Sequence, residues 1–118
     1  SSLHPINYAG NCWADSSGGS SPQNLGERKM ATYFGNIDLS AGFHKYACRW
    51  DSGGVTFFFV GKQMGAKVNT GYYNDFDLYI MLDLWFGSAS GNPNTDGQRP
   101  PEGIGNSYII NYVRAWRL

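Results

Sequence analysis

The sequence predicts an all-β fold of the sandwich or jelly-roll type, for three reasons. No window sustains apolar residues at the helical spacing i, i+3, i+4, i+7. Short segments that alternate, or that are rich in aromatic and β-branched residues, recur along the chain. Stretches rich in Gly, Ser, Asn and Pro separate them. Six or seven short strands joined by long loops are typical of a β-sandwich or jelly roll. The predicted strands are residues 3–8, 29–34, 43–50, 55–60, 63–67, 78–86 and 108–118.

The segment 43–50 has the cleanest alternation, with Tyr46, Cys48 and Trp50 on one face. We therefore expect Cys48 to be an ordinary buried thiol. A disulfide with Cys12, the other cysteine of the chain, stays open as an alternative.

Residues 55–60 are rich in Phe and β-branched side chains, which favours a strand. Gly61 and Lys62 then turn the chain towards residues 63–67. Together these segments predict a β-hairpin.

The segment 78–86 is apolar on both faces and is predicted to be a long central strand. Such a strand needs a covering layer on each side, and the remaining elements barely supply two. We therefore expect further sequence upstream. The Gly- and Ser-rich segments 11–23 and 87–106 are predicted loops, and the second is long enough to be a binding loop.

Composition narrows the class of ligand. Nine basic and nine acidic residues give no net charge, so neither a nucleic-acid nor an anionic-membrane partner is expected. The apolar run 78–82 is too short to cross a bilayer, and residues 1–5 carry no signal-peptide features. Aromatic residues make up 16% of the chain and charged residues only 15%. This balance is typical of extracellular β-domains that bind neutral sugars through ring stacking and hydrogen bonds. We expect one domain spanning residues 1–118.

Four segments, in order and at suitable spacing, resemble glycoside hydrolase family 16. FHKYACRW at 43–50 is similar to the family pattern F-H-x-Y-A-x-x-W, and VTFFFVGK at 55–62 is similar to I-x-W-Y-V-D-G-K. LYIMLDLWFG at 78–87 resembles M-Y-I-M-x-N-L-W-x-G. NYVRAW at 111–116 resembles the terminal strand D-Y-V-R-V-W/Y. The resemblance covers about two thirds of the chain.

The resemblance implies a concanavalin-like β-sandwich jelly roll, incomplete in this chain, and a secreted retaining endo-β-glycanase acting on a β-glucan or β-galactan. Laminarin, lichenan, agar and carrageenan are substrates of this kind. A retaining mechanism in the family is carried by a strand of type E-x-D-x-x-E, whose two Glu side chains lie on one face. The chain holds only Glu27 and Glu102, in unrelated segments. We therefore expect no catalytic residue here, a chain that is inactive alone, and a catalytic strand just upstream of Ser1.

On this interpretation the chain supplies the floor of the cleft and the walls of the sugar subsites. An alternative from a different class is a non-catalytic carbohydrate-binding module or lectin-like jelly roll. A third possibility is that a second polypeptide carries the missing strands, or that exposed sheet edges lead to self-association.

Six residues are candidates for substrate binding. The resemblance places Trp85 and Asp83 on the cleft strand, where an indole can stack on a pyranose and a carboxylate can bind hydroxyls. Packing in the core is the alternative for both. The acid pair Asp75 and Asp77 is interpreted as a polar strand entry. The full set of candidates is Trp85, Asp83, His4, Trp13, Tyr72 and Tyr73.

Other conspicuous residues are predicted to be structural. His44, Trp50 and Trp116 match framework positions of the family. Asn111 stands where the family often has an Asp ligand for a structural calcium, so we expect no calcium. Two histidines without an acidic partner at ligand spacing argue against zinc, and residues 17–20 lack the context of a phosphate loop. No metal or other cofactor is expected. Val60 stands where the family hairpin has Asp, a residue that suits a turn with positive φ.

Overall fold

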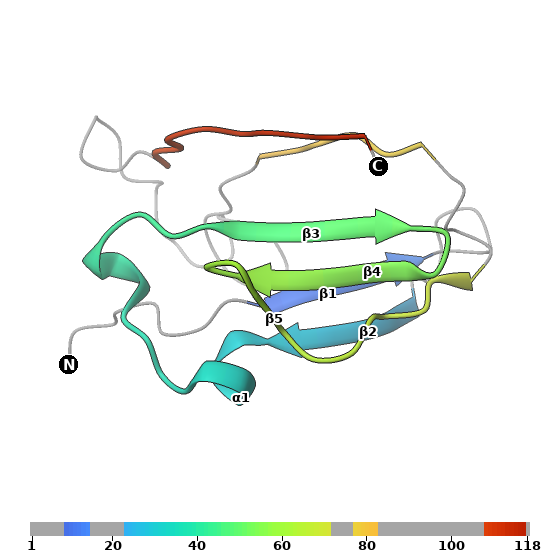
Figure 1. The fold of residues 1–118 in the computed structure, drawn as a ribbon, viewed down its shortest axis with the longest axis horizontal. Coiled ribbons are helices and arrows are strands. Elements are labelled where there is room, and N and C mark those ends of the chain that lie inside the picture. Colours follow the sequence, from blue (N-terminus) through green and yellow to red (C-terminus); the bar gives the residue numbers. More distant parts are fainter. Residues whose placement is uncertain (1–8, 15–22, 72–76, 83–107, 118) are drawn as a thin grey trace, which may run out of the picture. The chain divides into compact units, whose positions relative to one another are not determined.

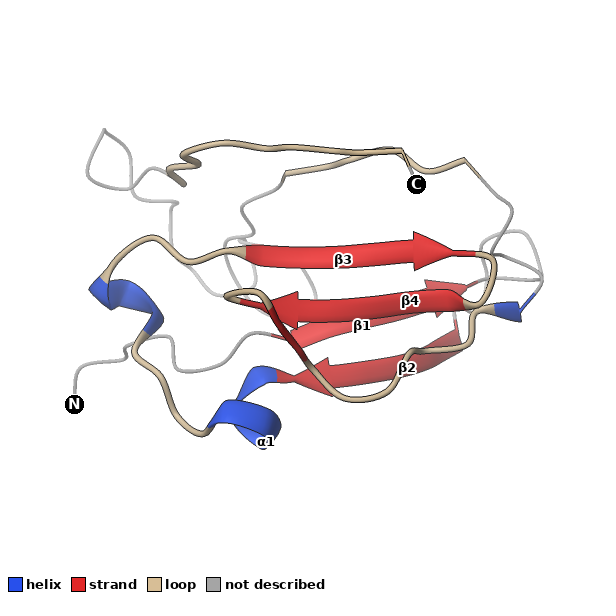
Figure 2. Ribbon diagram, in the orientation of Figure 1, coloured by secondary structure: helices blue, strands red, loops and turns tan. Residues whose placement is uncertain are grey.

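The computed structural model describes residues 9–14, 23–71, 77–82 and 108–117 (Figure 1). The chain divides into two compact units, residues 1–77 with Leu118 and residues 78–117. The described strands form two antiparallel sheets (Figure 2). The helical segments among the described residues are α1 (Met30–Phe34) and the short 3₁₀ turn η1 (Leu39–Ala41), with one further 3₁₀ residue at Gly71. The all-β prediction is therefore confirmed. The finer prediction of a sandwich jelly roll stays a prediction.

The first sheet pairs β1 (Ala9–Ala14) with β2 (Gln23–Lys29). The register shifts between Cys12 and Trp13, so that Leu25 has no partner and forms a β-bulge. The prediction of a loop over residues 11–23 is wrong at both ends, because residues 11–14 belong to β1 and Gln23 begins β2. The alternation in β1 is short and contains Gly, Asn and Cys, so only its pairing with β2 reveals it as a strand.

The second sheet has the order β3 (Tyr46–Asp51), β4 (Gly54–Phe59) and β5 (Lys62–Gln63). The strands predicted at 43–50 and 55–60 and the turn after them are confirmed, with bounds shifted by up to three residues. β5 is shorter than the predicted segment 63–67. Beyond it, Val55 and Val68 exchange backbone hydrogen bonds of 2.9 and 2.8 Å, which brings the chain back alongside β4.

The strand predicted at 29–34 is wrong, because only Lys29 belongs to a strand and α1 follows it. Met30 and Phe34 lie one helical turn apart and so share a face that packs on the core. Gly35 ends the helix with φ +73 and donates its N–H to the carbonyl of Ala31. A five-residue helix shows too little periodicity to be recognised in the sequence.

The hydrophobic core of the first unit lies against β4. Its buried members are Met30, Val55, Phe57, Phe59, Met64 and Val68. Cys12 and Leu25 of the first sheet pack against this cluster, so both sheets contribute to it. A side chain at Gly10 would meet the ring of Phe57, which shows how closely β1 approaches β4. β4 is buried along most of its length and is the central strand of its sheet.

The second unit differs from its prediction. The described parts of the expected strands 78–86 and 108–118 contain no strand. Leu78 to Leu82 are between 53% and 93% exposed, so they lack the covering layers that a strand apolar on both faces needs. Trp116 is 76% exposed, which contradicts the expectation that it packs in the framework. The guanidinium of Arg114 lies 4.8 Å from the ring centroid of Tyr112.

Candidate functional site

Trp13 is the one candidate binding residue that lies within the described part of the chain. It is 60% exposed and extends from β1 immediately after the register shift. The other five candidates, His4, Tyr72, Tyr73, Asp83 and Trp85, lie outside the described residues, as does Asp75.

Strand alternation decides which way Trp13 faces. Gly10 approaches Phe57 and Cys12 packs on the core cluster, so these two positions of β1 face the core. Asn11 and Trp13 have the opposite parity and belong to the outer face. An exposed indole on the outer face of a sheet is available for stacking against a ligand.

The bulge at Leu25 decides which residue of β2 lies opposite Trp13. Asn24 pairs with Trp13, and its side-chain oxygen accepts a 2.9 Å hydrogen bond from the N–H of Gly26, across the bulged residue. Leu25 can therefore pack on the core while its neighbour Asn24 stays exposed opposite Trp13. A bulge commonly re-aims the side chains of the strand that contains it.

The pairing adds polar groups that sequence reasoning missed. Asn24 pairs with Trp13, and Glu27 pairs with Asn11. The carboxylate of Glu27 forms a 3.3 Å ion pair with Lys29. The side-chain oxygen of Asn11 is buried and has no hydrogen-bond partner among the described residues. No signal in the sequence brings these residues together, because the register of β1 on β2 is a property of the pairing.

The outer face of the β1–β2 sheet thus presents the indole of Trp13, the amide of Asn24 and the carboxylate of Glu27, whereas the oxygen of the Asn11 amide is buried. Amides and carboxylates donate to or accept from hydroxyl groups, while the indole covers the apolar C–H face of a ring. Within the described residues of this sheet Glu27 is the only carboxylate. A retaining hydrolysis needs two carboxyl groups about 5–5.5 Å apart, whereas hydrogen bonding to hydroxyl groups needs only one carboxylate or amide.

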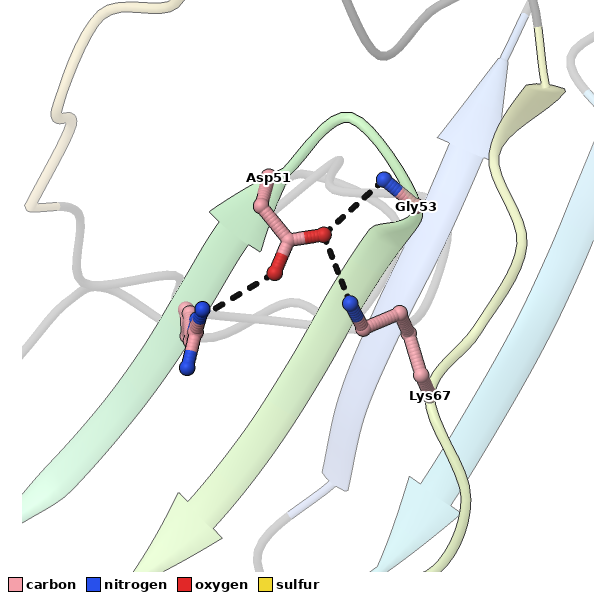
Figure 3. A network of polar contacts seen from close by, with 4 residues as sticks. Asp51, Gly53 and Lys67 are labelled. Carbon is pink, nitrogen blue, oxygen red and sulfur yellow. Dashed lines mark hydrogen bonds and ion pairs between the residues drawn. The ribbon is translucent and has the colours of Figure 1, made fainter. Parts of the chain in front are cut away.

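Asp51 has the densest polar contacts described, and they serve a turn (Figure 3). Its Oδ1 accepts from Lys67 Nζ at 2.6 Å and from the N–H of Gly53 at 2.9 Å, and its Oδ2 lies 3.2 Å from Arg49 Nε. The hydrogen bond from Lys67, followed by that from Gly53, lowers the pKa of Asp51 below its ordinary value. A carboxylate held ionised in this way is a poor general acid.

Both cysteines are free. Burial raises the pKa of Cys12, as does the nearby Cys48, while Arg28 lowers it. Desolvation also raises the pKa of Cys48, although the residue is exposed overall and the prediction that it is buried is wrong. Thiols with a raised pKa carry little thiolate at neutral pH, so neither is an activated nucleophile.

The described residues contain no cluster of three or more His, Cys, Asp or Glu side chains suited to a metal ion. Among the same residues, no helix combines the length and apolar character needed to cross a membrane. The chain matches no protein-family model, no curated protein and no solved structure.

Proposed function

We propose that this chain binds a polysaccharide through the outer face of the β1–β2 sheet. The observation that carries this proposal is the 60% exposure of Trp13 on a sheet face that also holds Asn11 and Asn24. Neutral sugars present alternating apolar C–H faces and hydroxyl groups. An indole flanked by amides complements both features without requiring charge on the ligand.

The family 16 resemblance extends the proposal to a parent activity. On this proposal the chain is part of a secreted retaining endo-β-glycanase with a concanavalin-like jelly roll, and it supplies cleft floor and subsite walls. Its substrate is a β-glucan or β-galactan. The support is the set of framework motifs, of which FHKYACRW and VTFFFVGK form the paired strands β3 and β4 and the turn after them.

A non-catalytic carbohydrate-binding module is the second candidate. Among the described residues, Trp13, Asn24 and Glu27 supply stacking and hydrogen-bonding groups on the outer face of the β1–β2 sheet, and such groups bind a glycan without an acid–nucleophile pair. In the enzyme proposal a catalytic strand must come from another segment or a second chain. Exposed apolar residues such as Tyr79, at 93%, support association with such a partner or with another copy.

Binding to insoluble and soluble glycans tests the proposal. The chain is expected to bind at least one of laminarin, lichenan, agarose and carrageenan, measured by affinity electrophoresis and calorimetry. Trp13→Ala should lower the affinity about tenfold, equivalent to about 1.4 kcal/mol. Trp116→Ala removes an indole of the second unit that is 76% exposed, and it should leave binding unchanged.

Hydrolysis separates the two candidates. Reducing-end release by this chain alone would contradict the expectation that it lacks catalysis. Release that appears only after addition of a polypeptide carrying an E-x-D-x-x-E strand would support the enzyme proposal. Binding without turnover in both cases favours the binding module. Wild-type binding by Trp13→Ala would remove Trp13 from the site.

A further inference from the structure

A pocket lies at the turn between β4 and β5, where the residues that precede β3 meet the residues that follow β4. It has a volume of about 280 Å³ and is lined by Phe43, His44, Lys45, Val60 and Gly61. The N–H of Val60 donates a 2.9 Å hydrogen bond to the carbonyl of Lys45, which connects residues 43–45 to residues 60–61. The volume lies just below the roughly 300–1,000 Å³ typical of small-molecule sites, so it suits a single ring.

His44 brings an unsatisfied polar atom to this pocket. Its ring packs against Phe59 with the centroids 5.6 Å apart, which agrees with the structural role expected for it. Its Nε2, however, is buried without a hydrogen-bond partner among the described residues. Such an atom costs about 1–3 kcal/mol when it stays unpaired. Because Nε2 is buried, a ligand in the pocket can relieve this cost only when the imidazole turns toward it.

Val60 is an independent anomaly in the same lining. Its φ is +48, and it is the only residue other than glycine with positive φ among those described. A β-branched side chain in this region is strained by about 1–2 kcal/mol. Strained residues of this kind gather at ligand sites, where the surrounding structure holds them.

The remaining side chains indicate the chemistry of the ligand. Among the described residues of the lining, Lys45 carries the single formal charge, and none of the others is a carboxylate. The ring of Phe43 is 71% exposed and Val60 is 53% exposed, so the walls offer apolar surface to a flat or puckered ring. A cation beside an aromatic wall suits an anion carried on a six-membered ring.

We propose that this pocket binds a single six-membered ring that bears a carboxylate, such as a uronic acid unit of a polysaccharide. Lys45 pairs with the carboxylate, Phe43 and Val60 contact the ring, and His44 Nε2 forms a hydrogen bond with a polar substituent. The same chemistry is present in an aromatic acid, so the experiment includes both sources. The site is separate from the surface around Trp13 and does not depend on neutral-glycan binding there.

In the test, the full chain is titrated with methyl β-D-glucuronide, methyl β-D-glucoside or benzoate. Calorimetry measures the affinity, and the imidazole ¹⁵N resonances report on His44. The glucuronide is expected to bind at least tenfold more tightly than the glucoside and to shift the Nε2 resonance of His44. Lys45→Gln and Phe43→Ala should each weaken glucuronide binding at least tenfold. Lys62→Gln removes a neighbouring exposed cation that is not among the described lining residues, and it should bind as the wild type does.

The outcomes distinguish a sugar acid, an aromatic acid and the absence of an acid-binding site. Stronger binding of the glucuronide supports a sugar source, and stronger binding of benzoate supports an aromatic acid in the same pocket. Equal affinity for glucoside and glucuronide, or no binding of either acid at millimolar concentration, overturns the proposal. So does an unchanged Nε2 resonance, or a loss on Lys62→Gln as large as that on Lys45→Gln. Near-ultraviolet circular dichroism of each variant shows whether a loss reflects the pocket or the fold.

Discussion

Two hairpin turns flank β4, and they differ in how well their residue types suit the backbone φ angles of the turn. Between β3 and β4, Asp51 pairs with Gly54, and Gly54 alone of the four turn residues has positive φ. Between β4 and β5, Phe59 pairs with Lys62, and both central residues, Val60 and Gly61, have positive φ.

The first turn is locally consistent. Asp51 accepts from the N–H two residues on, a contact typical of turns, and glycine occupies the position that disfavours a Cβ. The second turn has the positive φ values of a type I′ hairpin, for which Asn-Gly or Asp-Gly is preferred, but carries Val. Local preference therefore supports one turn, whereas the second depends on the packing and pairing around it.

The largest effect is expected from Gly54→Ala. Gly54 has φ +121, and an added Cβ would collide with the carbonyl oxygen of Val68. Because that carbonyl accepts the hydrogen bond from Val55, the variant should lose about 3 kcal/mol of unfolding free energy through strain and a disrupted bridge. Urea denaturation measures the loss.

Gly53→Ala is its matched control. The added Cβ would lie 3.1 Å from Lys67 Nζ, the movable end of a flexible side chain, and Gly53 lacks a positive φ. We expect a change of less than about 1 kcal/mol. Equal losses for the two variants would show that the approach of Val68 does not constrain the first turn.

Val60→Asn should act in the opposite direction. Asn tolerates positive φ, so relief of the strain should raise the unfolding free energy by about 1 kcal/mol. Val60→Ile retains the β-branch and should give no gain. Destabilisation by Asn would mean that the Val60 side chain contributes more through packing than it costs in strain. If the pocket proposal holds, Val60→Asn should also weaken glucuronide binding, an exchange of stability against function.

The smallest effect concerns Asp51 and pH. Because folding lowers the pKa of Asp51, the unfolded chain binds its proton more tightly. The contribution of Asp51 to stability is therefore present above the unfolded carboxyl pKa of about 3.9 and is lost as pH falls through the lower folded value. Unfolding followed between about pH 2 and 5 should show this decline.

Asp51→Asn should flatten that pH dependence, and Lys67→Gln should reduce it, because the hydrogen bond from Lys67 is the largest cause of the shift. An undiminished acid dependence in Asp51→Asn would assign it to other carboxyl groups. Both substitutions should cost less than Gly54→Ala, since exposed ion pairs contribute little to stability.

The contrast between the turns also shows where prediction from sequence succeeded. The β3–β4 hairpin and the turn after it follow from alternation and glycine within residues 46–61, and both are confirmed. The helix α1 was missed because five residues show almost no periodicity. Residues 78–82 have strong strand propensity, but propensity alone does not provide the neighbours that a strand needs.

Trp13 could be identified from the sequence as an exposed candidate, but Asn24 and Glu27 could not be placed beside it. The bulge at Leu25 shifts the register of the pairing, and a shift of one residue exchanges the two faces of a strand. The pocket of His44 was likewise missed, because its lining comes from segments about fifteen residues apart and from the strained conformation of Val60.

By itself the sequence determined the β class and the β3–β4 hairpin, because these depend on near neighbours and composition. The tertiary structure decided that β4, and not residues 78–82, is buried as a central strand, and that amides accompany Trp13 on one face. It also decided that Val60 and His44 line one pocket. These features depend on which distant segments pair and at what register. The free energy of pairing is a property of the two segments together, so neither segment reveals it alone.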